Sequence, residues 1–274
     1  MKSPLALFRR RPRVSVLRLE GVIGAAGRLG APSLTDARLA PLVEAAFRKG
    51  RPKAVALAIN SPGGSAAQSS LIAARIRRLA DELKIPVHAF VEDVAASGGY
   101  WLATAADRIH LDPNSIVGSI GVIYAGFGFP ELLARHGIER RVHTAGVDKS
   151  MLDPFRPERP EDVDRLMALQ RQIHANFIDQ VKSRRGARLA DRDLFTGEIW
   201  VGQGGIDVGL ADATGHLVPT MKALYGDELR FTVIAPRPPL FRRLGLPGVG
   251  DALGEAVGAA ESASLWARFG LAAP

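Results

Sequence analysis

The chain has 274 residues, of which 47% are hydrophobic and 23% are charged, enough for one large α/β domain or two small ones. This composition excludes an intrinsically disordered or collagen-like protein, and the absence of cysteine excludes a disulfide-stapled miniprotein, a thiol nucleophile and Cys-ligated metal sites. The formal net charge is +8, but the basic residues are spread along the chain and only 6% of residues are aromatic, so we expect no nucleic-acid partner.

The N-terminal residues 1–13 are predicted to form a basic tail. Its charges lie beside an apolar patch that is too short for a signal peptide or a membrane span. A solvated tail is the prediction that we favour, and peripheral contact with an anionic membrane surface is the alternative. The basic side chains are those of Lys2, Arg9, Arg10, Arg11 and Arg13.

Strands and helices are predicted to alternate from residue 14 onward. β-Branched residues favour a strand over residues 14–23, which a Gly-rich loop ends. Ser33, three residues before Asp36, is typical of a capping box, and the helix that it begins ends near Gly50. The continuous apolar run over residues 54–59 is typical of a strand that is buried on both faces of a parallel sheet.

The alternation continues toward the C-terminus. We predict further strands over residues 86–91, 108–111 and 140–143, and helices over residues 65–83, 97–106, 131–136 and 161–182. The longest helix has an apolar stripe that we expect to be buried, made of Val163, Leu166, Leu169, Ile173, Phe177 and Val181.

This order of elements predicts an α/β fold with a mostly parallel sheet and crossover helices. We expect residues 14–235 to form a single domain, because no repeat or low-complexity linker divides them. Residues 236–274 are predicted to be a Pro- and Gly-containing C-terminal tail. Within it, residues 251–271 have the spacing of an amphipathic helix that packs on the body or on a partner.

Ligands meet such a sheet at the carboxyl ends of its strands, where the predicted loops 60–65, 92–100 and 114–121 lie. All of these loops are rich in glycine and serine. Ser97 begins a helix of small residues, which places a hydroxyl beside backbone N–H groups that can hold an oxyanion. Ser97 is therefore a candidate nucleophile, and the alternative is that it only caps the helix.

A serine nucleophile needs a base, and the chain has no Gly-x-Ser-x-Gly, Ser-x-x-Lys or His-Glu-x-x-His motif. Arginine stays protonated, whereas lysine can act as a base where desolvation removes its charge. Six of the seven lysines lie in the tail, at helix ends, on polar helix faces or before a strand. Lys149 remains, in a loop after a predicted strand, and a salt bridge to Asp148 or Asp153 is an equally good interpretation of it.

Several separate motifs follow one another between residues 14 and 215. They are Ser61-Pro62-Gly63-Gly64, Ala96-Ser97-Gly98-Gly99-Tyr100, Gly118-Ser119-Ile120-Gly121-Val122-Ile123, Lys149-Ser150 with Pro154-Phe155, Thr196-Gly197-Glu198, and Gly209-Leu210 with Asp212. In this order they resemble the S49 family of serine peptidases, which includes signal peptide peptidase A and SohB-like proteins. The resemblance implies a ClpP/crotonase-like fold and a serine endopeptidase with a Ser/Lys catalytic dyad.

The resemblance also implies a role for individual residues. Ser97 would be the nucleophile, Lys149 the general base, and Ser119 a helper whose hydroxyl orients the lysine. A neutral lysine amine can take the serine proton, and water then hydrolyses the acyl-enzyme. No cofactor and no metal site are expected for this chemistry.

The glycines of these motifs have implied roles as well. Gly64 and Gly98 would supply the backbone N–H groups of the oxyanion hole. Gly63 and Gly99 would let the substrate come close to the backbone.

Family members act on unfolded or membrane-derived peptides, including remnant signal peptides, and form ring-shaped homo-oligomers in which a neighbouring subunit completes the site. We therefore expect peptide or unfolded polypeptide substrates and a ring of about four to eight subunits. Family members commonly carry an N-terminal membrane anchor, and no transmembrane helix or signal peptide is predicted here. This difference favours a cytoplasmic enzyme, with peripheral contact at the inner membrane as the alternative.

Two other classes of protein remain compatible with the sequence. Crotonase-like acyl-CoA enzymes share the expected fold and use Gly-rich oxyanion holes without a serine nucleophile. A non-catalytic module could bind peptides in the same Gly-rich cleft.

Overall fold

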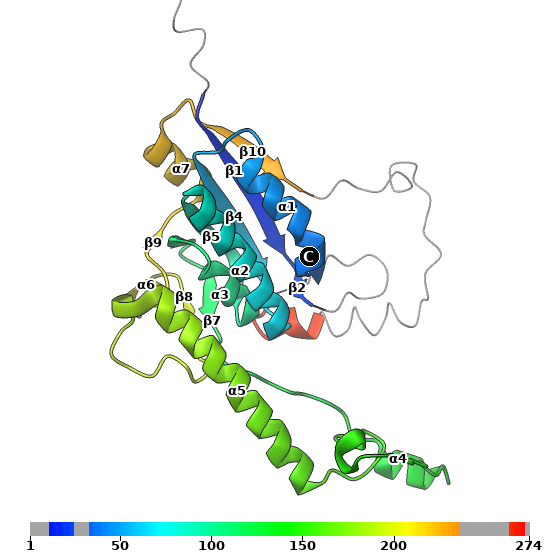
Figure 1. Cartoon of the computed structure of the whole chain (residues 1–274). Helices are drawn as coiled ribbons and strands as arrows, with labels where there is room; N and C mark the ends of the chain where they lie inside the picture. Colours follow the sequence, from blue (N-terminus) through cyan, green and yellow to red (C-terminus); the bar gives the residue numbers. More distant parts are fainter. Residues whose placement is uncertain (1–10, 25–32, 236–262, 272–274) are drawn as a thin grey trace, which may run out of the picture. The chain divides into compact units, whose positions relative to one another are not determined.

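The computed structural model describes residues 11–24, 33–235 and 263–271 (Figure 1). The strands are β1 (Arg13–Glu20), β2 (Val22–Ile23), β3 (Ser33–Leu34), β4 (Ala54–Ser61), β5 (Val87–Ala96), β6 (Arg108–Leu111), β7 (Ile116–Gly118), β8 (Ile199–Val201), β9 (Ala213–Thr214) and β10 (Arg230–Ile234). The helices are α1 (Asp36–Arg48), α2 (Ala66–Leu83), α3 (Gly98–Ala103), α4 (Pro130–Arg135), α5 (Pro160–Arg185), α6 (Gln203–Asp207) and α7 (Leu217–Tyr225). Short 3₁₀ helices span Val147–Ser150 and Gly186–Arg188, and residues 263–267 are helical.

The main sheet confirms the α/β fold with mostly parallel strands that the sequence predicts. Its strands lie in the order β10, β1, β4, β5, β6 and β9, and β7 extends the sheet by pairing with β5 and β8. All of these pairs are parallel except β7 with β8. Every residue of β4 is buried, as its continuous apolar run predicts for a central strand. Helices α1 and α2 lie across the strands of this sheet (Figure 1).

Strand β5 is longer than the sequence predicts. The expected strand over residues 86–91 was followed by a loop over residues 92–100, whereas β5 runs to Ala96. Its first half pairs with β6 through residues 88–91, and its second half pairs with β7 through residues 94–96. The register between β5 and β4 shifts between Ile59 and Ser61 of β4. This irregularity lies where the partner on the other side of β5 changes from β6 to β7.

The structure divides the chain into two compact units, where the sequence suggests one domain over residues 14–235. The first unit comprises the described residues up to Ile120 and from Gln180 onward, and the second comprises Gly121–Asp179. The main sheet belongs to the first unit, whereas α4 and most of α5 belong to the second. The expected outer boundaries stay predictions, since residues 1–10 and 236–262 lie outside the described residues.

Two expectations for the second unit are wrong. The strand predicted over residues 140–143 is absent, since these residues belong to neither a strand nor a helix. The apolar stripe of the long helix is only partly buried: Leu169 is 46% exposed and Ile173 is 37% exposed.

Asp212 holds the C-terminal part of α5 on the first unit. Its carboxylate accepts a hydrogen bond from Arg185 at 2.9 Å and one from the backbone N–H of Ile109 at 2.7 Å, and Arg188 adds a third at 3.3 Å. Burial would raise the pKa of Asp212, but these partners outweigh it and the pKa is lowered. The carboxylate thus connects β6 and α5 at the point where the motif Gly209-Leu210…Asp212 ends.

The buried side chains of His88 on β5 and His110 on β6 predict a loss of stability in mild acid. Their rings stack with 6.0 Å between centroids, and Nδ1 of His88 and Nε2 of His110 have no hydrogen-bond partner among the described residues. Burial lowers the pKa of both side chains from the usual value of 6.5. Arg108 lowers it further, whereas Asp107 opposes the shift at His88 and Asp212 opposes it at His110.

In the unfolded chain, His88 and His110 bind protons more readily than in the folded protein. The free energy of unfolding is therefore highest above about pH 6.5 and falls as the pH decreases below it. We expect the urea midpoint of the wild type to fall between about pH 7.5 and about pH 5.5. His110→Leu removes one of the two groups and should show a smaller fall. Equal falls in the two proteins would contradict the assignment.

Candidate active site

The predicted active-site loops of the first unit meet at the carboxyl ends of adjacent strands. Ser97 follows β5, Gly63 and Gly64 follow β4, and Ser119 follows β7. Since β5 pairs with both β4 and β7, these ends lie next to one another. The backbone N–H of Ser97 donates to the carbonyl of Gly118 at 2.9 Å, which joins the β5 and β7 loops directly.

Ser97 occupies a strained turn between β5 and α3. Its φ is 51° and its ψ is −120°, a region that a residue with a Cβ adopts only when its surroundings enforce it. The same kind of strained strand-to-helix turn presents the nucleophilic serine of α/β-hydrolases. Ser97 stands at the N-cap position, but its side chain accepts no capping hydrogen bond. Ser97 therefore begins α3 through its backbone, and its hydroxyl is not used as a helix cap.

The loop after β4 packs closely against this turn. A Cβ on Gly63 would lie 2.8 Å from Cβ of Ser97 and 2.8 Å from the carbonyl oxygen of Ala96. A Cβ on Gly98 would lie 2.4 Å from Oγ of Ser69. Gly63 has a φ of 106° and its close neighbours include backbone atoms, so only glycine fits there, whereas a side chain at Gly98 would require the Ser69 hydroxyl to move.

Two backbone amides lie near Ser97 and are suited to an oxyanion. The Cβ position of Gly98 is 3.4 Å from the amide nitrogen of Gly64, so the two residues are adjacent. Gly98 is the first residue of α3, so its N–H has no acceptor within the helix. No backbone acceptor for the N–H of Gly64 is found within the described ranges. Gly64 is exposed and Ser97 is partly exposed, so a substrate can reach this place.

Gly99 differs from the other glycines of the site. It is buried, and a Cβ there would lie 2.4 Å from the carbonyl oxygen of Ser61. This contact shows a packing role for Gly99 between α3 and β4. Its predicted contact with substrate, like that of Gly63, stays a prediction.

Ser119 lies beside the Ser97 turn and shares its unusual backbone. Its φ is also 51°, and its N–H donates to the carbonyl of Glu198 at 2.7 Å. Trp200 on β8 packs against the adjacent Gly118, where a Cβ would lie 2.6 Å from its ring. The sequence identified Thr196-Gly197-Glu198 only as a motif of the resemblance, and the structure gives it a role in holding the loop of Ser119.

Asn60 opens the predicted loop 60–65, and its side chain has a role there that the sequence did not identify. Its side-chain amide donates to Asp93 at 2.7 Å, and its side-chain oxygen accepts from the N–H of Val94 at 3.3 Å. These bonds hold the segment of β5 at which the register with β4 shifts. An asparagine directly after a buried apolar run is the sequence signal that could have indicated this role.

Lys149 belongs to the second unit, in the 3₁₀ helix Val147–Ser150, and its side chain is exposed there. The salt bridges that the sequence allowed for it are not formed. Asp148 pairs with Arg165 on α5, and Asp153 pairs with Arg140 at 3.2 Å. Among the described residues the Lys149 amine has no ion-pair or hydrogen-bond partner. Ser97 and Lys149 thus belong to different units, and their pairing stays a prediction.

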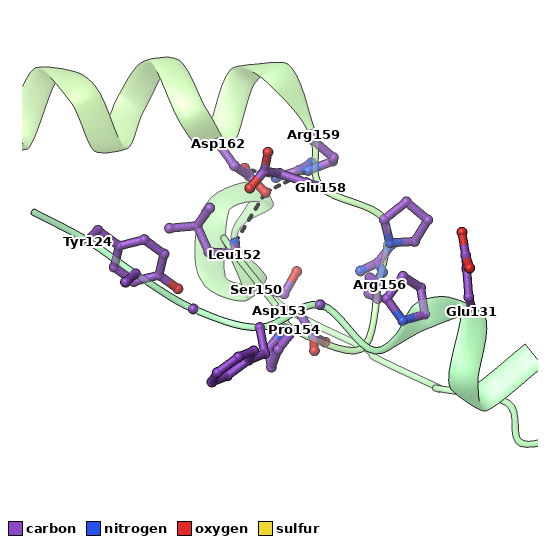
Figure 2. A pocket seen from close by; sticks show the side chains of 16 residues that line it. Tyr124, Glu131, Ser150, Leu152, Asp153, Pro154, Arg156, Glu158, Arg159 and Asp162 are labelled. Atoms are coloured by element: carbon purple, nitrogen blue, oxygen red, sulfur yellow. Dashed lines mark hydrogen bonds and ion pairs between the residues drawn. The ribbon is translucent and has the colours of Figure 1, made fainter. Parts of the chain in front are cut away.

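A cavity of about 870 Å³ lies in the second unit beside the Lys149 loop (Figure 2). Ser150, which follows Lys149, lines it together with Leu152 and Asp162. Asp162 accepts hydrogen bonds from Arg159 and from the N–H of Leu152, as the dashed lines of Figure 2 show. The hydrogen bond from Arg159 lowers the pKa of Asp162, so this carboxylate stays charged and holds the loop on α5.

Two negative findings hold for the residues described. No group of three or more His, Asp or Glu side chains is arranged to hold a metal ion. No helix is both long enough and apolar enough to cross a membrane.

Two relatives are similar to this chain over more than half of its length. The Na(+)/H(+) antiporter NhaA of Brucella melitensis is 48% identical over 272 residues, which covers 94% of this chain but only 37% of that protein. A putative signal peptide peptidase SppA of Enterococcus faecium is 30% identical over 173 residues, covering 63% of this chain and 50% of that protein. The chain therefore spans half or less of the length of these two relatives.

A solved structure of the 1510-N membrane-bound stomatin-specific protease, a mutant in complex with a substrate peptide, matches with a TM-score of 0.52. The match covers 90% of this chain and 98% of that chain at 14% identity, which shows a shared fold. The family model of Peptidase family S49 matches residues 80–225, more than half of the chain, including Ser97, Ser119 and Lys149. The chain therefore belongs to peptidase family S49, a family of serine proteases.

Proposed function

We propose that this chain is a serine endopeptidase that cleaves unfolded or membrane-derived peptides with a Ser97/Lys149 dyad. The observation that carries the proposal is the strained turn at Ser97: its hydroxyl caps no helix, and the turn lies beside the backbone amides of Gly64 and Gly98. Strain of this kind costs about 1–3 kcal/mol and is typical of active sites.

In the proposed reaction the neutral amine of Lys149 takes the proton of the Ser97 hydroxyl as its oxygen attacks the peptide carbonyl. The carbonyl oxygen becomes an oxyanion that the N–H groups of Gly64 and Gly98 stabilise. The C–N bond then breaks, and the new ammonium of Lys149 returns the proton to the leaving amine. Water, activated by the same amine, hydrolyses the Ser97 ester and frees the enzyme.

The base role requires that Lys149 lose its contact with bulk water when the site assembles, because desolvation favours the uncharged amine. The pairing of Asp148 with Arg165 supports this role, since it occupies the carboxylate nearest in sequence to Lys149. In the proposal the hydroxyl of Ser119 orients the amine. A neighbouring subunit of a ring of about four to eight copies would complete the cover over Lys149.

The substrate class rests on the resemblance and on the name of the Enterococcus relative, a putative signal peptide peptidase. We place the enzyme in the cytoplasm, with peripheral contact at the inner membrane through the basic N-terminal residues as the alternative. The antiporter name belongs to the whole Brucella protein, of which this chain spans 37%.

A fluorophosphonate label followed by peptide mass spectrometry tests the nucleophile. We expect one covalent adduct, on Ser97, and faster cleavage of unfolded casein than of compact folded proteins. A crotonase-like enzyme or a peptide-binding module would leave Ser97 unlabelled. Equal degradation of folded and unfolded proteins would contradict the substrate class alone.

A further inference from the structure

The C-terminal residues 263–271 fold back onto the strand that ends at Ser97. Trp266 is only 1% exposed, although it lies near the end of the chain. It packs against Val94 and Ala96 of β5, and Ile116 of β7 lies against the same cluster. Phe269 and Leu271 also pack there, and the N–H of each donates to the carbonyl of Trp266.

These contacts fall on the strand pair that holds the two serines of the proposed site. Val94 pairs with Ile116 and Ala96 pairs with Gly118 in the β5–β7 register. Ala96 immediately precedes Ser97, and Gly118 immediately precedes Ser119. Trp266 therefore lies against the strand ends from which both of the strained turns leave.

A strained turn persists only where packing and hydrogen bonds fix the segments on each side of it. Gly63 packs against the carbonyl of Ala96, and Gly118 accepts the N–H of Ser97. Trp266 adds the largest fully buried side chain of the described residues to this end of β5. Without its indole ring, a cavity would open beside Ala96 and the turn could relax.

We infer that Trp266 is a positioning residue for the proposed reaction: by packing on Val94 and Ala96 it keeps the Ser97 turn in its strained, reactive conformation. The inference rests on the proposed function of Ser97. It gives the C-terminal segment a part in catalysis, although Trp266 itself touches neither the hydroxyl nor the predicted oxyanion amides in any contact described.

The test measures the rate of fluorophosphonate labelling of Ser97 and the kcat and KM for a short peptide ester. Trp266→Ala should lower the labelling rate and kcat by up to about 100-fold, with little change in KM, because a small displacement of a reacting group costs rate rather than binding. Trp266→Phe, which restores a flat apolar ring, should recover most of the loss.

Met221→Ala is the matched control. Met221 is also fully buried and packs in the cluster that contains Phe90 of the same strand β5. Its loss should reduce the free energy of unfolding while leaving the labelling rate of the folded protein unchanged. Should Trp266→Ala fail to fold, Trp266→Leu carries the same comparison.

The outcomes separate this inference from the proposed function. A wild type that is never labelled at Ser97 overturns the proposed function. A labelled wild type with equally fast labelling of Trp266→Ala shows that Trp266 only stabilises the fold. Faster labelling of the variant, or of a chain that ends at residue 262, shows that the segment obstructs the site. Either of the last two results overturns the inference.

Discussion

Replacing Ser97 with alanine is expected to slow peptide hydrolysis by about 10⁴- to 10⁶-fold. The hydroxyl is the only group removed, and without it no acyl-enzyme can form. Residual hydrolysis would come from water attacking a carbonyl that the amides of Gly64 and Gly98 still polarise.

The same substitution should leave the protein folded. The Ser97 side chain makes no capping hydrogen bond, so no helix cap is lost. Alanine keeps the Cβ, so the strain at a φ of 51° and the contact with Gly63 stay the same. Thermal unfolding and circular dichroism of the variant should match those of the wild type.

Ser183→Ala is the matched control for Ser97→Ala. Ser183 is an exposed serine on α5 whose hydroxyl donates to the carbonyl of Gln180 at 2.8 Å. This control should retain full activity and full labelling. A Ser97→Ala protein that cleaves casein as fast as the wild type would remove the nucleophile assignment.

Lys149→Arg is expected to be as inactive as Lys149→Ala, with kcat lowered by about 10²- to 10⁴-fold. Guanidinium keeps the positive charge and the length of the side chain but cannot give up its proton near neutral pH. A base is therefore lost in both variants, whereas a residue that acts through its charge alone would be rescued by arginine. Lys149 is the only lysine of the second unit.

Lys49→Arg serves as the comparison, because Lys49 is an exposed residue at the end of α1. We expect this variant to hydrolyse peptides at the wild-type rate. The measurement is the initial rate on unfolded casein for each protein, after thermal unfolding has shown that all are folded. An active Lys149→Arg enzyme would exclude Lys149 as the base and would leave the Ser97 assignment untouched.

The sequence by itself determined the features that depend on neighbouring residues. The apolar run of β4 indicated a buried parallel strand, and the helix predicted over residues 65–83 is α2, whose N-cap Ser65 accepts a hydrogen bond from the N–H of Gln68. The loops rich in glycine and serine indicated the candidate site. Glycine has no Cβ, so a run of glycines in the sequence marks a place where a substrate or another backbone can come close.

Local sequence signals predicted a helix start less reliably where two neighbouring residues can both serve as the N-cap. The capping box predicted from Ser33 and Asp36 is not formed. Ser33 lies in β3, and Thr35 caps α1 by accepting from the N–H of Arg38. Both are good N-cap residues, and the pairing of β3 with β2 decides between them.

Only the tertiary structure decided the conformation on which the chemistry depends. The length of β5, and with it the positive φ of Ser97, follows from a register shift against β4 and from pairing with β7. The burial of Trp266 against Ala96 follows from the return of the C-terminal segment. These contacts join residues that are far apart in the chain. Their free energy depends on long-range packing, which the local pattern of residue types does not predict.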